Sequence, residues 1–237
     1  MSSVEVNAKA ISEDFEFQAL NQAVNYRKKS RDDFAAYLRG GVLEVGEGIG
    51  QFSAELDCMT AIKLLTLLEP DARFYERLRL KYNHHNVING TAGSLQRADY
   101  DSIISINVLE HIKKDGKEIE VYSKLLKRGG YLCLFVPACP SIYAPIDRSF
   151  GHFRRYTKKG LTSLLLASDL QIVDLRYFNI TGYFLWWLNF CVFRKMEFGA
   201  LKVRLFDKHI FPFTQAFESK VRLPFGQSLV AIARKAQ

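Results

Sequence analysis

Cysteine is scarce in this chain of 237 residues, and its four cysteines form no pattern of metal ligands. No two of them make a CxxC pair, and none belongs to a histidine–cysteine cluster at zinc spacing. We interpret them as reduced packing residues of a cytoplasmic protein, and we expect neither a metal site nor a disulfide framework. Residues 1–17 lack an apolar core behind a basic start, so they do not fit a secretory signal.

Long hydrophobic runs are also lacking. The longest, residues 177–193, has 17 positions and is interrupted by asparagine, threonine and glycine, whereas a membrane span needs about 20 predominantly apolar residues. It contains Trp186 and Trp187 and is followed by Arg194 and Lys195. We expect a buried or ligand-covering helix, and we keep an interfacial membrane helix and a true span as alternatives.

The first part of the chain lacks an excess of either charge, whereas the second part has an excess of positive charge. From Asp147 onward there are 15 lysine and arginine residues against 6 acidic ones, whereas residues 1–146 carry 18 against 19. The formal net charge of +8 therefore belongs to the C-terminal part. Such a part suits a phosphate, an anionic lipid or an acidic substrate, and a scattered basic surface is the alternative.

Apolar periodicity predicts alternating helices and strands. A helical pattern over residues 12–39 ends at Gly40–Gly41. Helical patterns also end at residues 56 and 82, and another covers 161–168. Expected strands lie at 42–45, 63–68, 102–108, 131–136, 171–178 and 228–234. Strands separated by helices at this pitch predict parallel βαβ units, hence an α/β fold with a doubly wound sheet.

A glycine-rich turn, Glu44-Val45-Gly46-Glu47-Gly48-Ile49-Gly50, follows the first expected strand. Glycines let the backbone turn sharply and approach a ligand closely. The dinucleotide fingerprint GxGxxG is not met, because Gln51 follows the third glycine. Glu69 lies at the tip of the next strand, 19 positions after Gly50, where its carboxylate can accept both ribose hydroxyls. We therefore expect a nucleoside ligand, with a solvated acid as the alternative for Glu69.

These two motifs together resemble class I S-adenosylmethionine-dependent methyltransferases. Tyr100–Ile112 and Leu126–Gly130 are similar to later motifs of that family, in the same order. The segment Gly151-His152-Phe153-Arg154-Arg155-Tyr156 resembles a bacterial methyltransferase-domain subgroup with a GH-x-RRY motif, of type 11, 12 or 23. The resemblance implies a Rossmann-like sheet of seven mostly parallel strands with an antiparallel last strand.

The resemblance also implies a single methyltransferase domain over residues 1–237. It comprises an N-terminal helical segment (1–40), a cofactor-binding core (41–136), and an acceptor-side loop and aromatic-rich insertion (137–160 and 179–224). The cofactor is S-adenosyl-L-methionine, and its binding residues are Glu44 for the methionine amino group, Gly46, Gly48 and Gly50 along its path, Glu69 for the ribose, Ser94 and Leu95 for the adenine, and Asn107 near the methionine end. Glu47 stands where most relatives have a small residue.

Methyl transfer to a hydroxyl needs a nucleophile held close and a base that removes its proton, and it needs no metal. His111 and His152 are the candidate bases, since histidine titrates in a suitable range. His111 could instead pack under the cofactor. Arg155, Tyr156 and Trp186 are candidate acceptor contacts. Hydrogen bonds within the loop, or an arginine fork satisfied by Asp147 or by carbonyls, are the structural alternatives.

We expect a cytoplasmic methyltransferase that acts on a small-molecule, sugar, glycan or lipid-linked acceptor. The pattern allows peripheral membrane contact through Trp186, Trp187, Arg194 and Lys195. An RNA or protein methyltransferase is an alternative, although nucleic acid is disfavoured because no Asn-Pro-Pro-Tyr-like run is present. A non-catalytic cofactor-binding protein is another. The sequence leaves the acceptor, the methylated atom and the oligomeric state open.

Overall fold

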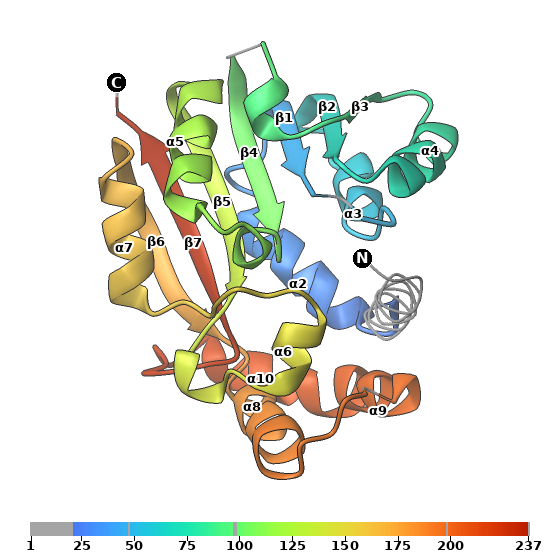
Figure 1. The fold of residues 1–237 in the computed structure, drawn as a ribbon, viewed down its shortest axis with the longest axis vertical. Coiled ribbons are helices and arrows are strands. Elements are labelled where there is room, and N and C mark those ends of the chain that lie inside the picture. Colours follow the sequence, from blue (N-terminus) through green and yellow to red (C-terminus); the bar gives the residue numbers. More distant parts are fainter. Residues whose placement is uncertain (1–20, 47, 97–98, 198, 237) are drawn as a thin grey trace.

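The computed structural model describes residues 21–46, 48–96, 99–197 and 199–236, and a seven-stranded sheet forms its centre (Figure 1). The strand order is β3-β2-β1-β4-β5-β7-β6. The strands are β1 (Gly40–Val45), β2 (Ile62–Glu69), β3 (Asn86–Asn89), β4 (Tyr100–Ile106), β5 (Leu126–Pro137), β6 (Leu170–Phe178) and β7 (Ser228–Lys235). Strands β1 to β5 pair in parallel, and β7 lies antiparallel between β5 and β6. The predicted doubly wound sheet with an antiparallel last strand is confirmed.

Helices cover both faces of the sheet, which explains why the central strands are continuous apolar runs. One face packs on α5 (Asp115–Leu125) and α7 (Lys158–Leu166), with Leu43, Tyr122 and Leu161 in one buried cluster. The opposite face packs on α2 (Val24–Phe34), α3 (Ser53–Asp57) and α4 (Ala72–Lys81), with Phe34 and Val42 in a second cluster. Adjacent strand residues therefore enter opposite cores, as the two-residue period of a strand requires.

Several element boundaries differ from the predictions. Within the predicted helix over 12–39 the described helix is α2, and residues 1–20 lie outside the described chain. Gly40 begins β1 rather than ending a helix, because its N–H donates to the Ala61 carbonyl and it pairs with Ile62. Strand β3 and helix α5 were not predicted. β3 has only four residues and no buried position, so it carries no apolar pattern.

The apolar run 177–193 is not one helix. Strand β6 ends at Phe178, and Asn179, with φ of +62°, turns the chain into α8 (Ile180–Trp186). A π-helix, η4 (Trp187–Val192), continues it, and α9 (Ala200–Leu205), the π-helix η5 (Phe206–Ile210) and α10 (Phe211–Glu218) follow. Together they form a helical layer at the lower end of the molecule in Figure 1. Among the described residues, no helix is long and apolar enough to cross a membrane.

Two buried or half-buried carboxylates fix this insertion to the rest of the fold. Asp207 in η5 accepts hydrogen bonds of 2.9 Å from the N–H groups of Asn25 and Tyr26, at the start of α2. Glu218 in α10 accepts from the N–H groups of Asn179 and Ile180, at 3.1 and 2.8 Å. Carboxylates at helix N-termini satisfy otherwise unpaired donors and oppose the positive end of the helix dipole. The insertion is therefore an anchored layer of the fold.

Short helical turns complete the described elements. They are the 3₁₀ turns η1 (Ala92–Ser94), η2 (Leu109–His111) and η3 (Pro140–Ile142), and helix α6 (Pro145–Ser149). Turn η1 follows β3, η2 follows β4, and η3 and α6 follow β5. They lie after strands of the parallel part of the sheet, on the side of the strands' carboxyl ends, where open α/β sheets bind their ligands.

Candidate active site

The glycine turn after β1 has the backbone that its sequence predicts. Gly46, Gly48 and Gly50 have φ angles of +71°, +59° and +76°, which residues with a side chain rarely adopt. A Cβ atom on Gly46 would lie 2.5 Å from Val108 Cγ2, and one on Gly50 would lie 2.8 Å from Tyr82 Cε2. Glycine is therefore required both by conformation and by space. Glu47 lies outside the described residues.

Two buried carboxylates flank this turn on adjoining strands. Glu44 and Glu69 are 3% and 4% exposed, and the pairing of Val45 with Leu68 sets the two strand ends side by side. The Glu44 carboxylate accepts a hydrogen bond of 2.8 Å from Ser53 Oγ. The two Glu69 oxygens accept from the N–H groups of Gly48 and Asp71, each at 2.8 Å. One acid per strand end beside three left-handed glycines fits the amino and ribose groups of S-adenosylmethionine.

The remaining predicted cofactor residues lie on three different segments. Ser94 is exposed at the end of η1, and its hydroxyl donates to the Thr91 carbonyl at 2.7 Å. Leu95 is half-buried against the main core. Asn107 follows β4 with a left-handed φ of +51°, held by an N–H bond of 2.8 Å to the Phe135 carbonyl. A residue other than glycine with a left-handed φ is strained, and such strain is concentrated at functional sites.

A cavity of about 250 Å³ lies between the carboxyl ends of the central strands and the insertion. Asn107 and His152 contribute polar atoms to it, and Trp186 and Phe190 form part of its apolar wall. The exposed Lys195 and Lys202 also line it, as do Leu185, Val203, Phe206, Tyr26, Pro137 and Arg155. Of the predicted catalytic and acceptor residues, the cavity therefore brings together His152, Arg155 and Trp186 with Asn107.

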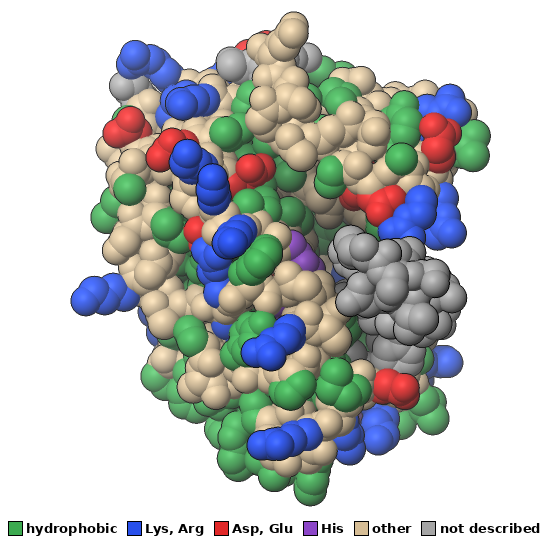
Figure 2. All heavy atoms as spheres, viewed as in Figure 1, with side chains coloured by type: hydrophobic (Ala, Val, Ile, Leu, Met, Phe, Trp, Pro, Cys, Tyr) green, Lys and Arg blue, Asp and Glu red, His purple; other side chains and the backbone are tan. Residues whose placement is uncertain are grey.

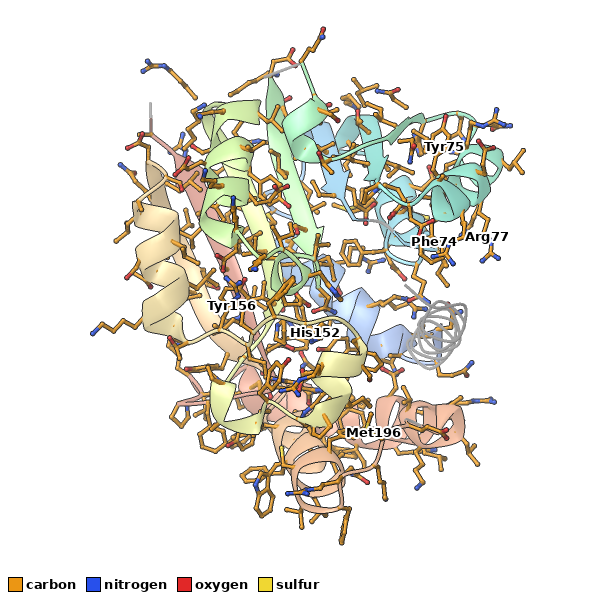
Figure 3. All side chains as sticks on the ribbon, in the orientation of Figure 1. Phe74, Tyr75, Arg77, His152, Tyr156 and Met196 are labelled. Carbon is orange, nitrogen blue, oxygen red and sulfur yellow. The ribbon has the colours of Figure 1, made fainter. Side chains whose placement is uncertain are left out.

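His152, labelled in Figure 3, lines this cavity and is held by the buried acid Asp147. Its Nδ1 lies 3.1 Å from Asp147 Oδ1, and its Nε2 lies 4.0 Å from Glu110 Oε1. The ring of His111 stands edge-on to that of His152, with 4.6 Å between centroids. Burial alone would raise the pKa of Asp147, but the hydrogen bond from His152 and the charge of Arg155 outweigh it and hold this pKa below its ordinary value.

Arg155 is engaged inside the protein. Its Nε and Nη2 donate to Asp147 Oδ1 at 2.9 and 2.8 Å, and its Nη1 donates to the Ala138 carbonyl at 3.2 Å. Its guanidinium also lies 4.4 Å from the centre of a Trp186 ring. This is the arginine fork satisfied by Asp147 and a carbonyl, which the sequence allowed as the alternative to acceptor binding. All three guanidinium nitrogens of Arg155 are therefore engaged within the protein, although the side chain also lines the cavity.

Tyr156, another candidate acceptor contact, is hydrogen-bonded within the fold. Its hydroxyl lies 3.1 Å from the Leu109 carbonyl and 3.0 Å from Asp115 Oδ2, and its side chain is not among those lining the cavity. Tyr156 therefore ties the loop after β5 to η2 and α5, which holds His152 in place. Trp186 lies in the cavity wall, where its indole N–H donates to the Ile142 carbonyl at 3.2 Å. Only the neighbouring Trp187 is exposed.

Sequence reasoning missed Glu110, and it considered Asp147 only as a partner of Arg155. Glu110 is fully buried, although it lies between Leu109 and His111 in a motif that suggested no separate role. Ligand-type atoms of Glu110, His111 and His152 lie within 4.8 Å of one another. The only sequence signal for Asp147 was its spacing of five residues before His152, which does not by itself predict a hydrogen bond.

Comparison with known proteins agrees with this geometry. Residues 43–134 match the model of a methyltransferase domain. No curated protein matches the chain. Solved structures share its fold: an S-adenosylmethionine-dependent methyltransferase from Mesorhizobium loti is 12% identical, with a TM-score of 0.60 over 87% of this chain and 98% of that one.

Two further structures extend the comparison. A protein from Bacillus halodurans, provisionally assigned as a methyltransferase, is 17% identical, with a TM-score of 0.61 over 89% of this chain and 99% of its own. The N-methyltransferase NodS from Bradyrhizobium japonicum, crystallised with S-adenosyl-L-homocysteine, is 15% identical, with a TM-score of 0.56 over 90% of this chain and 86% of its own. Residues 43–134 thus carry a methyltransferase domain, and the chain shares its fold with these S-adenosylmethionine-dependent methyltransferase structures.

Proposed function

We propose that the chain methylates a hydroxyl group on an acceptor that has an apolar part and an anionic group, such as a lipid-linked sugar or glycan. The observation that carries this proposal is the cavity that His152, backed by Asp147, lines together with the aromatic residues Trp186 and Phe190 of the insertion. A hydroxyl needs a base that removes its proton as the methyl group is transferred. Nitrogen and sulfur acceptors are often nucleophilic without one.

The cofactor residues have separate tasks in this proposal. Glu44 and Glu69 would hold the amino and ribose groups, and the glycine turn lets the backbone approach the ligand. When bound, S-adenosylmethionine supplies a methyl group on a positively charged sulfur. Asn107, at the end of β4 and in the cavity wall, connects the cofactor side of the site with the acceptor side.

His152 accepts the proton of the acceptor hydroxyl at Nε2 while the oxygen forms its bond to the methyl carbon. Bound S-adenosylmethionine would supply the methyl group as a sulfonium leaving group that keeps the bonding electron pair, so the transfer would need no redox partner. Asp147 accepts the Nδ1 hydrogen bond, which fixes the tautomer and leaves Nε2 as the acceptor. Asp147 and Glu110 both lie close enough to stabilise the imidazolium that forms. Holding the acceptor oxygen in line with the methyl group would lower the barrier further.

The composition of the cavity supports an acceptor with both apolar and acidic parts. Trp186, Phe190 and Leu185 offer apolar and aromatic surface, which suits a hydrocarbon or a ring. Lys195 and Lys202 line the same cavity and are exposed, so their ammonium groups can meet a phosphate or carboxylate. Within the cavity lining, Glu197 and the buried Asp207 are the acids.

A labelled-methyl assay tests this function. The purified protein is incubated with methyl-labelled S-adenosylmethionine and either a lipid extract or a panel of sugar-linked and lipid-linked hydroxyl compounds, with and without EDTA. We expect label in the acceptor fraction, and we expect His152→Ala to lower the rate about 10²–10⁴-fold. Affinity for S-adenosylhomocysteine should stay unchanged in this variant.

Two histidine variants serve as controls. His111→Ala removes the neighbouring ring and tests the other candidate base, and His209→Ala removes an exposed histidine of η5. The account predicts a small effect of His111→Ala and none of His209→Ala. A large loss in His111→Ala with a mild one in His152→Ala would transfer the base role to His111. Label that enters only RNA or protein would overturn the acceptor class.

A further inference from the structure

The insertion carries most of the exposed apolar surface of the described chain. Of 19 exposed large hydrophobic residues, 13 lie between residues 179 and 224, which is about a fifth of the sequence. They include Phe184, Trp187, Phe193, Leu201, Phe213 and Phe217, and the last two are 78% and 53% exposed. We call the surface that these side chains form the insertion face. A concentration of this kind marks an interaction surface rather than the scattered apolar residues of an ordinary exterior.

The charge of the insertion is as uneven as its hydrophobicity. All seven lysine and arginine residues between positions 179 and 224 are exposed. Of the three acids there, Asp207 is buried and Glu218 is half-buried, where both cap helices, so only Glu197 is exposed. Figure 2 shows lysine and arginine side chains beside hydrophobic ones over this lower end of the molecule. The insertion face therefore combines aromatic residues with positive charge.

The helices of the insertion are two-sided, so this exposure is not an unfinished core. Trp186 and Phe190, four residues apart, are buried together with Ile142 in a separate cluster. Phe211 is buried in the core behind the sheet, whereas Phe213 and Phe217 on the same helix face outward. The outward side chains are thus presented by helices whose inner sides are packed, and Glu218 caps the first of these helices, α8, at its start. Helices of this kind lie in the plane of a membrane interface.

We infer that the insertion face docks on the surface of an anionic lipid bilayer. Aromatic residues suit the boundary between headgroups and hydrocarbon, and lysine and arginine are drawn to anionic lipids. A second copy of this chain is disfavoured as the occupant, because the exposed residues of the insertion carry seven positive charges against one negative charge, and pairing two copies would bring like charges together. The short helices described here fit contact from one side, since none is long enough to span a bilayer.

Docking would also orient the cavity of the candidate active site. Lys195 and Lys202 line that cavity and belong to the same segment as Phe193 and Leu201 of the insertion face. Met196, between α8 and α9, lies at this lower end of the molecule in Figure 3 and is half exposed. A bilayer against the face would therefore lie beside the cavity. Docking itself does not depend on the proposed acceptor, so the two can be tested separately.

Vesicle co-sedimentation of the full chain, without acceptor, tests this inference. Vesicles of phosphatidylcholine with phosphatidylglycerol are compared with vesicles of phosphatidylcholine alone, at low and high salt. We expect binding to the anionic vesicles that weakens with salt. Trp187→Ser combined with Phe193→Ser should lower the partition coefficient at least about tenfold, and Arg194→Gln combined with Arg204→Gln should lower it about fivefold for each charge removed.

Matched variants keep the result interpretable. Leu80→Ser combined with Phe153→Ser removes two exposed apolar side chains outside the insertion, 72% and 54% exposed, and should leave binding unchanged. Retained affinity for S-adenosylhomocysteine checks that each variant is folded. Absence of binding at low salt overturns the inference, and so does equal binding by the Trp187 and Phe193 double variant. A concentration-dependent dimer that this double variant abolishes would assign the face to a second copy instead. None of these outcomes depends on finding methyl transfer.

Discussion

At the scale of single residues, Asp147 is the centre of the acceptor side of the site. Its carboxylate is fully buried and accepts from His152, from Arg155 and, through Oδ2, from the N–H of Ala144. One acid thus orients the candidate base, neutralises a buried guanidinium and holds the start of α6. Sequence reasoning could identify the histidine and the arginine by type, but only the folded loop shows that they share one partner.

Asp147→Asn should change stability and its dependence on pH. The pKa of Asp147 lies below its ordinary value in the folded protein, so its stabilising contribution is present above about pH 4 and is lost as the pH falls through the folded pKa. The variant should lose about 3–5 kcal/mol at pH 7, because Arg155 stays buried without its counter-charge. Urea unfolding from pH 7 to pH 3 measures both effects.

A surface acid provides the comparison for this variant. Asp32→Asn removes a 58% exposed partner of Arg31, and it should change stability by less than about 1 kcal/mol. The acid-induced loss of stability should be shallower in Asp147→Asn than in the wild type, and it should keep its wild-type slope in Asp32→Asn. Equal pH profiles for all three proteins would mean that Asp147 is not ionised and paired in the folded state.

At the scale of elements, periodicity predicts the parallel strands well and the connecting pieces less well. Strands β1, β2, β4 and β5 are buried on both faces, so their apolar runs are strong signals. Strand β3 is short and lies at the edge, and its residues carry no such signal. The first part of the insertion, up to Phe193, belongs to one apolar run in the sequence, because both its buried and its outward positions are hydrophobic. Only the structure separates Trp186 in the cavity wall from Trp187 on the surface.

The turn after β1 yields a prediction at this scale. Gly46→Ala should weaken binding of S-adenosylhomocysteine at least about tenfold and lower stability by about 1–2 kcal/mol or more. The left-handed φ penalises a side chain, and the new Cβ would lie 2.5 Å from Val108 Cγ2. Calorimetry and thermal unfolding check the two effects. Gly116→Ala is the control, because its Cβ would meet only Leu164 Cδ2 at 3.4 Å, within helix α5. An unaltered affinity in Gly46→Ala would mean that the turn can rearrange.

At the scale of the whole molecule, different strands of the sheet position the cofactor side and the acceptor side of the site. The ends of β1 and β2 carry the glycine turn with Glu44 and Glu69. The ends of β4 and β5 lead to Asn107 and His152, and the end of β6 leads to the insertion. The glycine turn could be predicted from the sequence, because its three glycines are closely spaced and follow a strongly apolar strand. In the acceptor half the sequence offers candidates such as His152 and Trp186 but not their arrangement, because the cavity residues come from segments spread between Ala23 and Ser228 and meet only through long-range packing.

The central claim is that the turn and the two carboxylates hold S-adenosylmethionine, and calorimetric titration with S-adenosylmethionine and S-adenosylhomocysteine tests it most directly. The account predicts micromolar binding of both ligands to the wild type, and a loss of at least about tenfold in Glu69→Ala. It predicts no loss in Glu76→Ala, which removes an exposed acid of α4. No binding by the folded wild type, or equal binding by Glu69→Ala, would contradict the account.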